Sequence, residues 1–398
     1  MNYNKILDFL YKKGIHTVDL GLERVKMLLE KLGNPHLDLN VILVGGTNGK
    51  GSTATMISSI LQEASFKVGQ YSSPHLIRFT ERFRVNGEEI LKKDIEKIFD
   101  QVKPHITDQT YFEIITVMAY LYFKEEEVDF AIMEVGMGGR LDATNVVDPM
   151  VSVITNVSLE HTQHLGKTVE AITFEKAGII REGGYAVTAA EGEALEILQQ
   201  IAMKRQATLL VATPTGLELG LMGEFQKTNA GIAIKTTKSL KHFGVEIPKI
   251  AFVNGLSKAR WPGRFELFRR NIIMDCAHNV AGVEILMEEL TALKEDYEYE
   301  KMHLVFGAME DKDYKSMISI LEPMFDKIIF TRPLGERGEM KERSADPKVM
   351  AKLVDDHKKV IILESPTEAF KKAKSLTSEE DLMVVCGSCF LVGDLIRG

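Results

Sequence analysis

A glycine-rich segment behind an apolar stretch is the part of the chain best suited to chemistry. Residues 41–45 read VILVG, residues 46–53 read GTNGKGST, and residues 54–61 are expected to form a helix. A glycine-rich turn between a strand and a helix lets backbone N–H groups converge on an anion, and the helix dipole and a lysine add positive charge. The segment therefore predicts a polyphosphate site with Lys50, and a neighbouring hydroxyl that can bind Mg²⁺.

Two positions depart from the common phosphate-loop pattern. Gly51 separates Lys50 from Ser52, and Val44 occupies the place of the first glycine. A glycine-rich turn without a ligand is the alternative interpretation. The clustering of lysine, glycine and hydroxyl residues after a strongly apolar strand favours the phosphate site.

Glu134 comes near the end of a second apolar segment, residues 130–135. A buried carboxylate requires a cation or hydrogen-bond donors, and the carboxyl ends of parallel strands are where α/β proteins bind ligands. The position predicts a ligand-binding carboxylate, with an ion pair to Arg140 as the alternative.

Two histidines and a lysine follow. The spacing of His161 and His164 allows a transition-metal site. Magnesium prefers oxygen ligands but tolerates one imidazole, and a surface pair of histidines is the simpler interpretation. Lys176 is expected in a helix over residues 168–178, beside apolar residues on a partly buried face, although the spacing alone favours the alternative of a solvated helix lysine.

Two strand ends in the second half of the chain carry cysteines. Residues 275–279 read DCAHN and residues 386–389 read CGSC. The second is formally a Cys-x-x-Cys between a strand and a helix, as in thiol-redox proteins. The intervening Gly387-Ser388 makes an anion-binding helix start by itself, which is the favoured interpretation.

Composition narrows the class of protein. A chain of 398 residues with 45% hydrophobic and 27% charged residues is long enough for two ordinary globular domains. The net charge of -8 argues against general attraction to nucleic acid or to an anionic membrane. Three cysteines make no disulfide framework and suit a reducing compartment. No signal peptide and no membrane span are expected.

The pattern of apolar residues and the turn residues predict the helices and strands that must position the candidate site residues. Expected helices cover residues 20–32, 92–102, 111–123, 168–178, 194–203 and 223–240. Expected strands cover 41–45, 67–71, 130–135, 151–155, 185–190, 208–211, 264–268, 271–275, 303–306, 327–330, 360–363 and 382–385. Residues 78–85 are expected to be extended and to turn back at Asn86-Gly87. Strands alternating with helices predict mainly parallel, doubly wound sheets, and Trp261-Pro262-Gly263 marks a linker.

Ten segments, in this order, resemble the folylpolyglutamate synthase/dihydrofolate synthase family of the Mur ligase superfamily. They are DLGLERV (19–25), GTNGKGST (46–53), SSPHLIRFTERFRVNGEEI (72–90), EVGMGGRLDATN (134–145), SLEHTQHLG (158–166), FEKAGI (174–179), WPGRFE (261–266), DCAHN (275–279), GAMEDKD (307–313) and CGSCFLVG (386–393). Each segment alone is weakly to moderately specific, whereas ten in the same order are highly specific.

The resemblance implies an α/β protein of two domains. Residues 1–259 would form a Mur-ligase-type ATP-binding domain that holds the phosphate loop in a mainly parallel, doubly wound sheet. Residues 263–398 would form a smaller, Rossmann-like glutamate-ligase domain. The active site would lie between the domains and require closure.

The implied reaction is ATP-dependent amide formation. A carboxylate of a folate or of dihydropteroate takes the γ-phosphoryl group of ATP, and the amine of L-glutamate attacks the resulting acyl phosphate. The resemblance further implies a cytoplasmic enzyme, often monomeric, that makes folylpolyglutamates and also dihydrofolate. One of these two activities alone, a ligase for a cell-wall precursor and a non-catalytic nucleotide-binding regulator are the alternatives.

Family roles carry over to matching positions of the first domain. The implied ATP-binding loop consists of Thr47, Asn48, Gly49, Lys50, Gly51, Ser52 and Thr53. Ser52, Ser73 and Glu134 would belong to one Mg²⁺ site, and Glu134 and His161 would contribute to a second. Lys176 would be carbamylated, which turns a cation into an anion that assists the metal site. Asn229 would contact adenine.

Four positions of the second domain also receive roles. Arg264 would reach the phosphates and Asp275 the nucleotide, while His278 and Ser388 would lie on the glutamate side. The implied catalytic residues are Lys50, His161, Lys176 and Arg264.

This chain departs from the family pattern at a few positions. Phe225 stands where a histidine is usual, and Glu160 replaces a more frequent aspartate. Cys276 and Cys389 occupy variable positions. None of these departures removes an implied metal or phosphate ligand.

Overall fold

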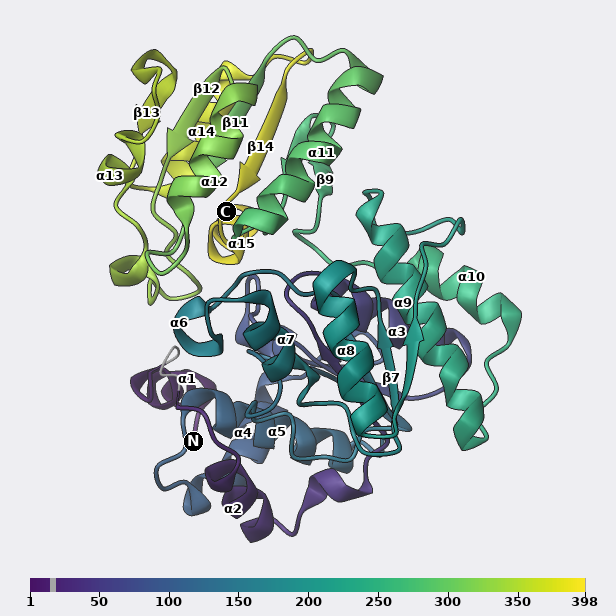
Figure 1. Cartoon of the computed structure of the whole chain (residues 1–398). Coiled ribbons are helices and arrows are strands. Elements are labelled where there is room, and N and C mark those ends of the chain that lie inside the picture. Colours follow the sequence, from purple (N-terminus) through teal and green to yellow (C-terminus); the bar gives the residue numbers. More distant parts are fainter. Residues whose placement is uncertain (15–18, 398) are drawn as a thin grey trace. The chain divides into compact units, whose positions relative to one another are not determined.

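The computed structural model describes residues 1–14 and 19–397, which separate into two compact units (Figure 1). Unit 1 comprises Met1–Pro74, Thr80–Gly220 and Gln226–Arg260. Unit 2 comprises the chain from Trp261 onward together with two short excursions, His75–Phe79 and Leu221–Phe225. The predicted domain limits, 1–259 and 263–398, stay a proposal.

Unit 1 is built on an eight-stranded sheet in the described residues, with the strand order β4-β3-β2-β5-β1-β6-β7-β8. Its strands are β1 (Val41–Gly45), β2 (Val68–Tyr71), β3 (Phe83–Val85), β4 (Glu88–Glu89), β5 (Phe130–Glu134), β6 (Val151–Ile154), β7 (Tyr185–Thr188) and β8 (Thr208–Val211). The strands from β2 to β8 in this order are parallel, whereas β3 and β4 are antiparallel additions at one edge. The strand β1 therefore lies inside the sheet, between β5 and β6.

The α-helices of this part of the chain are α1 (Tyr3–Lys12), α2 (Glu23–Lys31), α3 (Lys50–Glu63), α4 (Lys92–Val102), α5 (Tyr111–Glu125), α6 (Thr162–Leu165), α7 (Val169–Ala177), α8 (Gly192–Lys204), α9 (Phe225–Ser239) and α10 (Lys249–Lys258). The helix α3 packs on β1, β2 and β5 and is covered in turn by α10. A Cβ atom at Gly255 would lie 2.6 Å from Cα of Ile60, so the close approach of α10 to α3 requires glycine there.

Unit 2 contains a six-stranded sheet in its described residues, with the order β13-β12-β11-β14-β10-β9. Its strands are β9 (Glu266–Arg269), β10 (Ile272–Met274), β11 (Met302–Phe306), β12 (Lys327–Phe330), β13 (Val360–Ile362) and β14 (Leu382–Cys386), and its α-helices are α11 (Val280–Tyr297), α12 (Tyr314–Leu321), α13 (Pro347–Ala351), α14 (Pro366–Leu376) and α15 (Cys389–Arg397). Only β9 is antiparallel to its neighbour.

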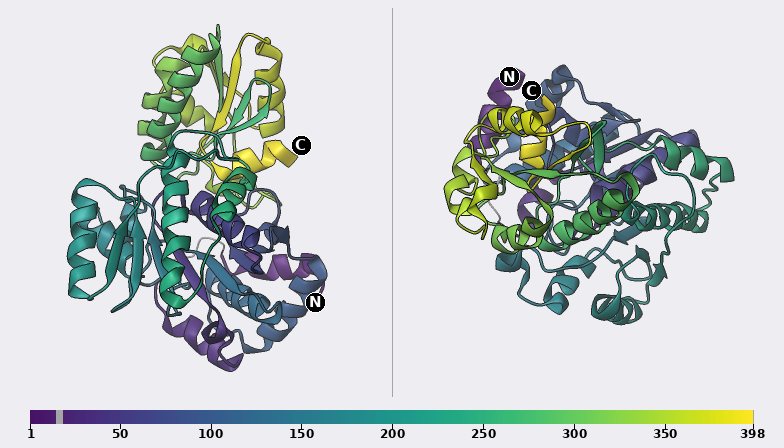
Figure 2. Two further views of the ribbon diagram at one scale, coloured as in Figure 1. Left: turned by 90° about the vertical axis from the view of Figure 1, so that its right-hand side faces the viewer. Right: turned by 90° about the horizontal axis from the view of Figure 1, so that it is seen from above.

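Alternating side chains of β11 and β14 enter two separate apolar clusters. Leu304 and Val384 pack with α11 and α12 in one cluster, whereas Val305 and Val385 pack with α14 and α15 in the other. Successive residues of a strand point to opposite faces, so helices cover both faces of this sheet (Figure 2). The predicted fold class, α/β with two parallel-dominated sheets, is confirmed.

One predicted segment is wrong in part. Residues 78–85 were expected to be extended, but Phe79–Arg82 form a 3-10 turn and only Phe83–Val85 form a strand. All four residues of the turn are buried, which an extended strand with alternating faces does not favour. The predicted turn at Asn86-Gly87 is confirmed, because β3 and β4 pair antiparallel around it.

The start of α5 allows a stability prediction. The Thr110 hydroxyl accepts a hydrogen bond from the Glu113 N–H, and the Glu113 carboxylate accepts one from the Thr110 N–H, which makes a capping box. We expect Thr110→Ala to lower the free energy of unfolding by about 1 kcal/mol. Urea unfolding measures this change, and Thr110→Ser, which keeps the hydroxyl, is the matched control. Equal stability of the alanine and serine variants would contradict the cap.

Among the helices within residues 1–14 and 19–397, none combines the length and the apolar character needed to cross a bilayer.

Candidate functional site

The predicted phosphate loop joins β1 to α3, as the sequence indicated. Gly46 has a φ of 134°, and a Cβ there would lie 1.9 Å from Oγ1 of Thr155. Gly49 has a φ of 80°, and its Cβ would lie 2.4 Å from Oδ1 of Asn229. Residues with a side chain rarely adopt such positive φ angles, and a Cβ atom at either position would clash with its neighbour. Both positions therefore require glycine.

Residues that follow β6 hold the loop in place. The Asn48 N–H donates to Oδ1 of Asn156 at 2.9 Å, and the Thr155 hydroxyl donates to the Asn48 carbonyl at 2.6 Å. Sequence reasoning did not single out these two residues. Their position directly after a predicted strand could have indicated them, because neighbouring parallel strands end at the same edge of a sheet, where ligands bind.

Lys50, the first residue of α3, folds back over the loop. Its Nζ donates to the carbonyl oxygens of Gly46 at 3.2 Å and Thr47 at 2.9 Å. Ser52 is buried in the first turn of the helix. The lysine and the start of the helix therefore meet at the glycine-rich loop, an arrangement that suits an anion.

The beginning of α9 lies against this loop. Nε2 of Gln226 donates to Oγ of Ser52 at 3.4 Å, and Nδ2 of Asn229 donates to Oε1 of Gln226 at 2.9 Å. Asn229, predicted to contact adenine, is thus beside the phosphate loop, while its role stays a prediction. Gln226 was not among the predicted site residues.

Glu134 ends β5, the strand next to β1, and pairs in register with Val44. Its side chain is buried, and one of its carboxylate oxygens accepts the Ser73 N–H at 3.3 Å. Arg140 pairs with Glu175 at 2.8 Å, so the alternative of a Glu134–Arg140 ion pair is wrong. The structure places Glu134 and Ser73 together at the edge of the sheet where the phosphate loop begins.

Lys176 is buried, with 3% of its surface exposed, so the alternative of a solvated helix lysine is wrong. Its Nζ donates at 2.8 Å to the carbonyl of Gly46, which also accepts from Lys50. Burial, together with the smaller effect of the positive charge of Lys50, lowers the pKa of Lys176 from 10.5 to about 7, against the opposing effect of Glu160. A large fraction of this amine is therefore neutral near pH 7.

His161 and His164 differ in their surroundings, and their pairing as metal ligands stays a prediction. Nε2 of His161 lies 3.7 Å from a carboxylate oxygen of Glu160, and the His161 side chain is 31% exposed. His164 is exposed in the short helix α6. Within residues 1–14 and 19–397, no group of three or more His, Cys, Asp or Glu side chains is arranged to hold a metal ion.

Four further predicted residues lie in unit 2, near the carboxyl ends of β10 and β14. These strands are parallel neighbours, with Met274 opposite Val385. Asp275 follows β10 and accepts the N–H groups of Phe265 at 2.6 Å and Ala277 at 2.7 Å. Burial raises the pKa of Asp275 to about 6, against the opposing charge of Arg264.

His278 and Ser388 occupy the same edge of the unit 2 sheet. Nδ1 of His278 lies 2.8 Å from the carbonyl oxygen of Cys276. Ser388 is buried after β14, and its hydroxyl accepts the Phe390 N–H at 3.1 Å. The structure therefore brings Arg264, Asp275, His278 and Ser388 to one region of unit 2, as it brings the other predicted residues to one region of unit 1.

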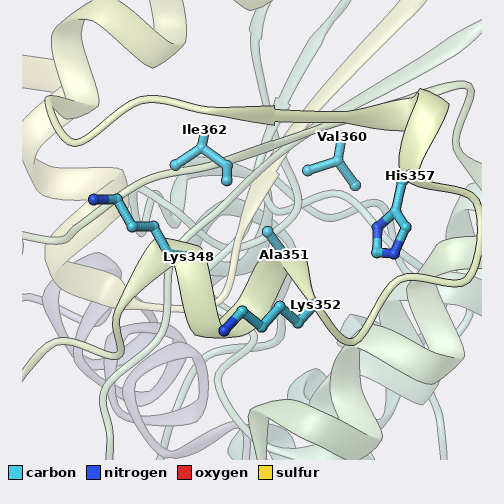
Figure 3. A pocket seen from close by; sticks show the side chains of 6 residues that line it. All are labelled: Lys348, Ala351, Lys352, His357, Val360 and Ile362. Carbon is cyan, nitrogen blue, oxygen red and sulfur yellow. The ribbon is translucent and has the colours of Figure 1, made fainter.

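A separate pocket lies between α13 and β13 (Figure 3). Its lining consists of Lys348, Ala351, Lys352, His357, Val360 and Ile362. No predicted site residue lines it, so this pocket adds nothing to the candidate site.

Comparison with known proteins bears on both units. Residues 44–248 match the model of the Mur ligase middle domain, and residues 263–389 match that of the Mur ligase glutamate ligase domain. The chain is 35% identical to the dihydrofolate synthase/folylpolyglutamate synthase of Bacillus subtilis, over 94% of each protein. It is 32% identical to a probable bifunctional folylpolyglutamate synthase/dihydropteroate synthase of Haloferax volcanii, over 99% of this chain. It spans about half (50%) of the length of that relative.

Two solved structures agree with this result. The Escherichia coli FolC protein in complex with DHPP and ADP is 31% identical, with a TM-score of 0.87 over 100% of this chain and 97% of that one. The bifunctional folylpolyglutamate synthase/dihydrofolate synthase of Yersinia pestis, complexed with AMPPNP and a Mn ion, is 30% identical, with a TM-score of 0.87 over 100% and 98%. The chain therefore belongs to the folylpolyglutamate synthase/dihydrofolate synthase family of the Mur ligase superfamily.

Proposed function

We propose that this chain is an ATP-dependent ligase that adds L-glutamate to folates and also converts dihydropteroate to dihydrofolate. The observation that carries the proposal is the convergence on the phosphate loop. Lys50 and Lys176 share the carbonyl of Gly46, and Glu134 ends the strand beside that loop. The names of the relatives supply the substrate class.

The proposed reaction begins with two anions that repel each other. Lys50 and the loop N–H groups hold the β- and γ-phosphates of ATP and offset their charge, so that a carboxylate oxygen of the folate can attack the γ-phosphorus. ADP leaves and an acyl phosphate forms. The amine of L-glutamate attacks the acyl carbon, and phosphate leaves as the amide bond is completed.

The residues near the loop fit a magnesium ion. Ser52 and Ser73 offer hydroxyl groups and Glu134 a buried carboxylate, which are the oxygen donors that Mg²⁺ prefers. Magnesium usually takes one or two protein carboxylates and completes its shell with phosphate oxygens and water. We propose one site with Ser52, Ser73 and Glu134, and a second with Glu134 and His161. Bound metal would neutralise charge on the phosphates during transfer.

The remaining roles extend the proposal. We propose that Lys176 reacts with CO₂ to form a carbamate, for which its neutral amine is the required form. In unit 2, Arg264 would bind phosphate, Asp275 the nucleotide, and His278 and Ser388 the glutamate. The monomeric state and the cytoplasmic location stay predictions.

The direct test offers dihydropteroate and tetrahydrofolate in parallel. With Mg-ATP and L-glutamate, ADP release is followed together with the mass of the product. We expect turnover of both acceptors. Turnover of one acceptor alone would establish a single activity. Turnover of a UDP-linked muropeptide instead would establish the cell-wall alternative, and ATP binding without any amide product would favour the regulator.

Glu134 provides a specific prediction for the metal site. We expect Glu134→Gln, which keeps the shape of the side chain and removes its charge, to lower the apparent Mg²⁺ affinity or the turnover by at least about 10–100-fold, the usual effect of losing a partner that only supports a metal ligand. Activity measured across a Mg²⁺ titration shows this change. Glu175→Gln is the matched control, because Glu175 pairs with Arg140 and not with the loop. An unchanged Mg²⁺ dependence in Glu134→Gln would remove Glu134 from the metal site.

A further inference from the structure

The cysteines of unit 2 are paired differently from what their spacing suggests. Cys386 ends β14 and packs in the apolar cluster on the α11 and α12 side of the sheet. Cys276 and Cys389 belong to the cluster on the α14 and α15 side. The sheet thus separates the two cysteines of the Cys-x-x-Cys segment and places Cys389 on the same side as Cys276, 113 positions away in sequence (389 − 276).

Two observations bring the Cys276 sulfur to the start of α15. The Cys276 thiol and Cys389 are hydrogen-bonded to each other. A Cβ atom built on Gly263 would lie 2.9 Å from Sγ of Cys276 and 3.2 Å from a methyl of Val392, which is one helical turn after Cys389. The Cys276 N–H also donates to the Gly263 carbonyl at 2.8 Å, which fixes its backbone. The two thiols are therefore immediate neighbours held by separate elements.

Their surroundings make the two sulfurs unequal. The hydrogen bond with Cys276 lowers the pKa of Cys389 well below its ordinary value, and the positive charge of Arg264 and a hydrogen bond with His278 act in the same direction. The same thiol–thiolate contact and burial raise the pKa of Cys276. Burial also raises that of Cys386. Both side chains are buried, and Cys389 is the more exposed of the two, at 8% against 2% for Cys276. A low-pKa thiol beside a second thiol is the arrangement found at redox-sensitive sites, where the attacking sulfur must also be reached from solvent.

We propose that Cys276 and Cys389 form a redox-sensitive pair, which hydrogen peroxide converts into an intrachain disulfide and which dithiols restore. The Cys389 thiolate attacks one peroxide oxygen, the O–O bond breaks, and hydroxide leaves, so that Cys389 becomes a sulfenic acid. The Cys276 sulfur then attacks the Cys389 sulfur, the S–O bond breaks, and the departing hydroxide takes the Cys276 proton. In sum, two thiols and one peroxide give one disulfide and two waters.

The location of this pair connects it to the proposed ligase site. Cys276 follows Asp275, and Cys389 follows Ser388 and contacts His278. A disulfide would draw the two sulfurs to about 2.05 Å and would remove the thiolate that His278 contacts. On the proposed function, His278 and Ser388 hold L-glutamate, so oxidation is expected to raise the KM for L-glutamate several-fold.

The chemical test uses the full chain and does not depend on catalysis. Reduced protein is treated with increasing hydrogen peroxide, and intact mass is measured with and without a later dithiothreitol step. We expect a reversible loss of two hydrogen masses, and peptide mapping without reduction should show a Cys276–Cys389 link. The Cys386→Ser variant should form the same link, whereas Cys276→Ala and Cys389→Ala should not. No link in folded wild-type protein, or a link that includes Cys386, would overturn the proposal.

Kinetics then test the regulatory consequence. The KM for L-glutamate is compared between oxidised and re-reduced protein, with Cys276→Ala treated in the same way as the control that cannot form the link. A several-fold rise confined to oxidised wild-type protein supports the consequence. Equal KM values for protein with and without the disulfide would overturn it. If the chain lacked ligase activity altogether, the mass result would still decide whether the disulfide forms, so the two proposals fail independently.

Discussion

Replacing Lys50 with methionine is expected to lower kcat/KM for ATP roughly 10²–10³-fold, the usual effect of removing one preorganised group that stabilises transferring charge. Lys50 is the first residue of α3, and its Nζ donates hydrogen bonds to the carbonyl oxygens of Gly46 and Thr47 in the phosphate loop. Methionine keeps the length of the side chain and removes the charge. Initial rates of ADP release at varied ATP measure the effect.

The control for this prediction is a lysine in the same unit that is remote from the loop. Lys258 pairs with Glu63 on the surface, and its side chain is 63% exposed. We expect Lys258→Met to retain normal turnover, and thermal unfolding should show that both variants are folded. Wild-type kinetics in Lys50→Met would mean that the phosphate loop is wrongly assigned.

Removal of CO₂ is expected to inactivate the wild-type enzyme, and bicarbonate is expected to restore it. The reason is the environment of Lys176, where burial and the charge of Lys50 keep the pKa near 7 and leave a neutral amine able to form a carbamate. Lys176→Met should lose most turnover and show no response to bicarbonate. Intact mass under CO₂-replete conditions with Mg-ATP should show the added carbamate. A free amine there would contradict the modification.

The same lysine predicts a pH dependence of stability in the CO₂-free protein. The pKa of Lys176 is about 7 in the folded protein, below its ordinary value of 10.5. Between pH 7 and pH 10.5, Lys176 is therefore mostly neutral in the folded protein and mostly protonated in the unfolded chain. The burial penalty of the charged lysine is fully present below pH 7 and is relieved as the pH rises toward 10.5. Lys176→Met should therefore stabilise the protein by a few kcal/mol near pH 6 and by much less near pH 10.

Urea unfolding at several pH values tests this dependence. Lys204→Met is the matched control, because Lys204 is an exposed lysine in the last turn of α8. Its effect on the free energy of unfolding should be small and nearly constant with pH. A Lys176→Met effect that is equally flat would mean that Lys176 is not held as a buried, weakly basic amine.

The sequence by itself determined the features that depend on neighbouring residues. The glycines, lysine and hydroxyls of the phosphate loop are contiguous, and the apolar run before them is short, mostly β-branched and ended by glycine, which favours a buried strand over a helix. Helix limits followed wherever the apolar period was strong, as in α4, which matches its predicted range of residues 92–102. Alternation of strands and helices sufficed for the α/β class because parallel strands need crossover connections.

Only the tertiary structure decided which distant groups meet. Lys176 is buried where its Nζ donates to the carbonyl of Gly46, 130 positions away in the sequence. Arg140 pairs with Glu175 because the packing of α7 brings that carboxylate to it. The two strands before Asp275 and Ser388 became neighbours only when the sheet formed, and this placed Cys389 beside Cys276 instead of Cys386. Burial, pKa and partner choice are properties of the assembled core, because each depends on side chains contributed by segments far apart in the chain.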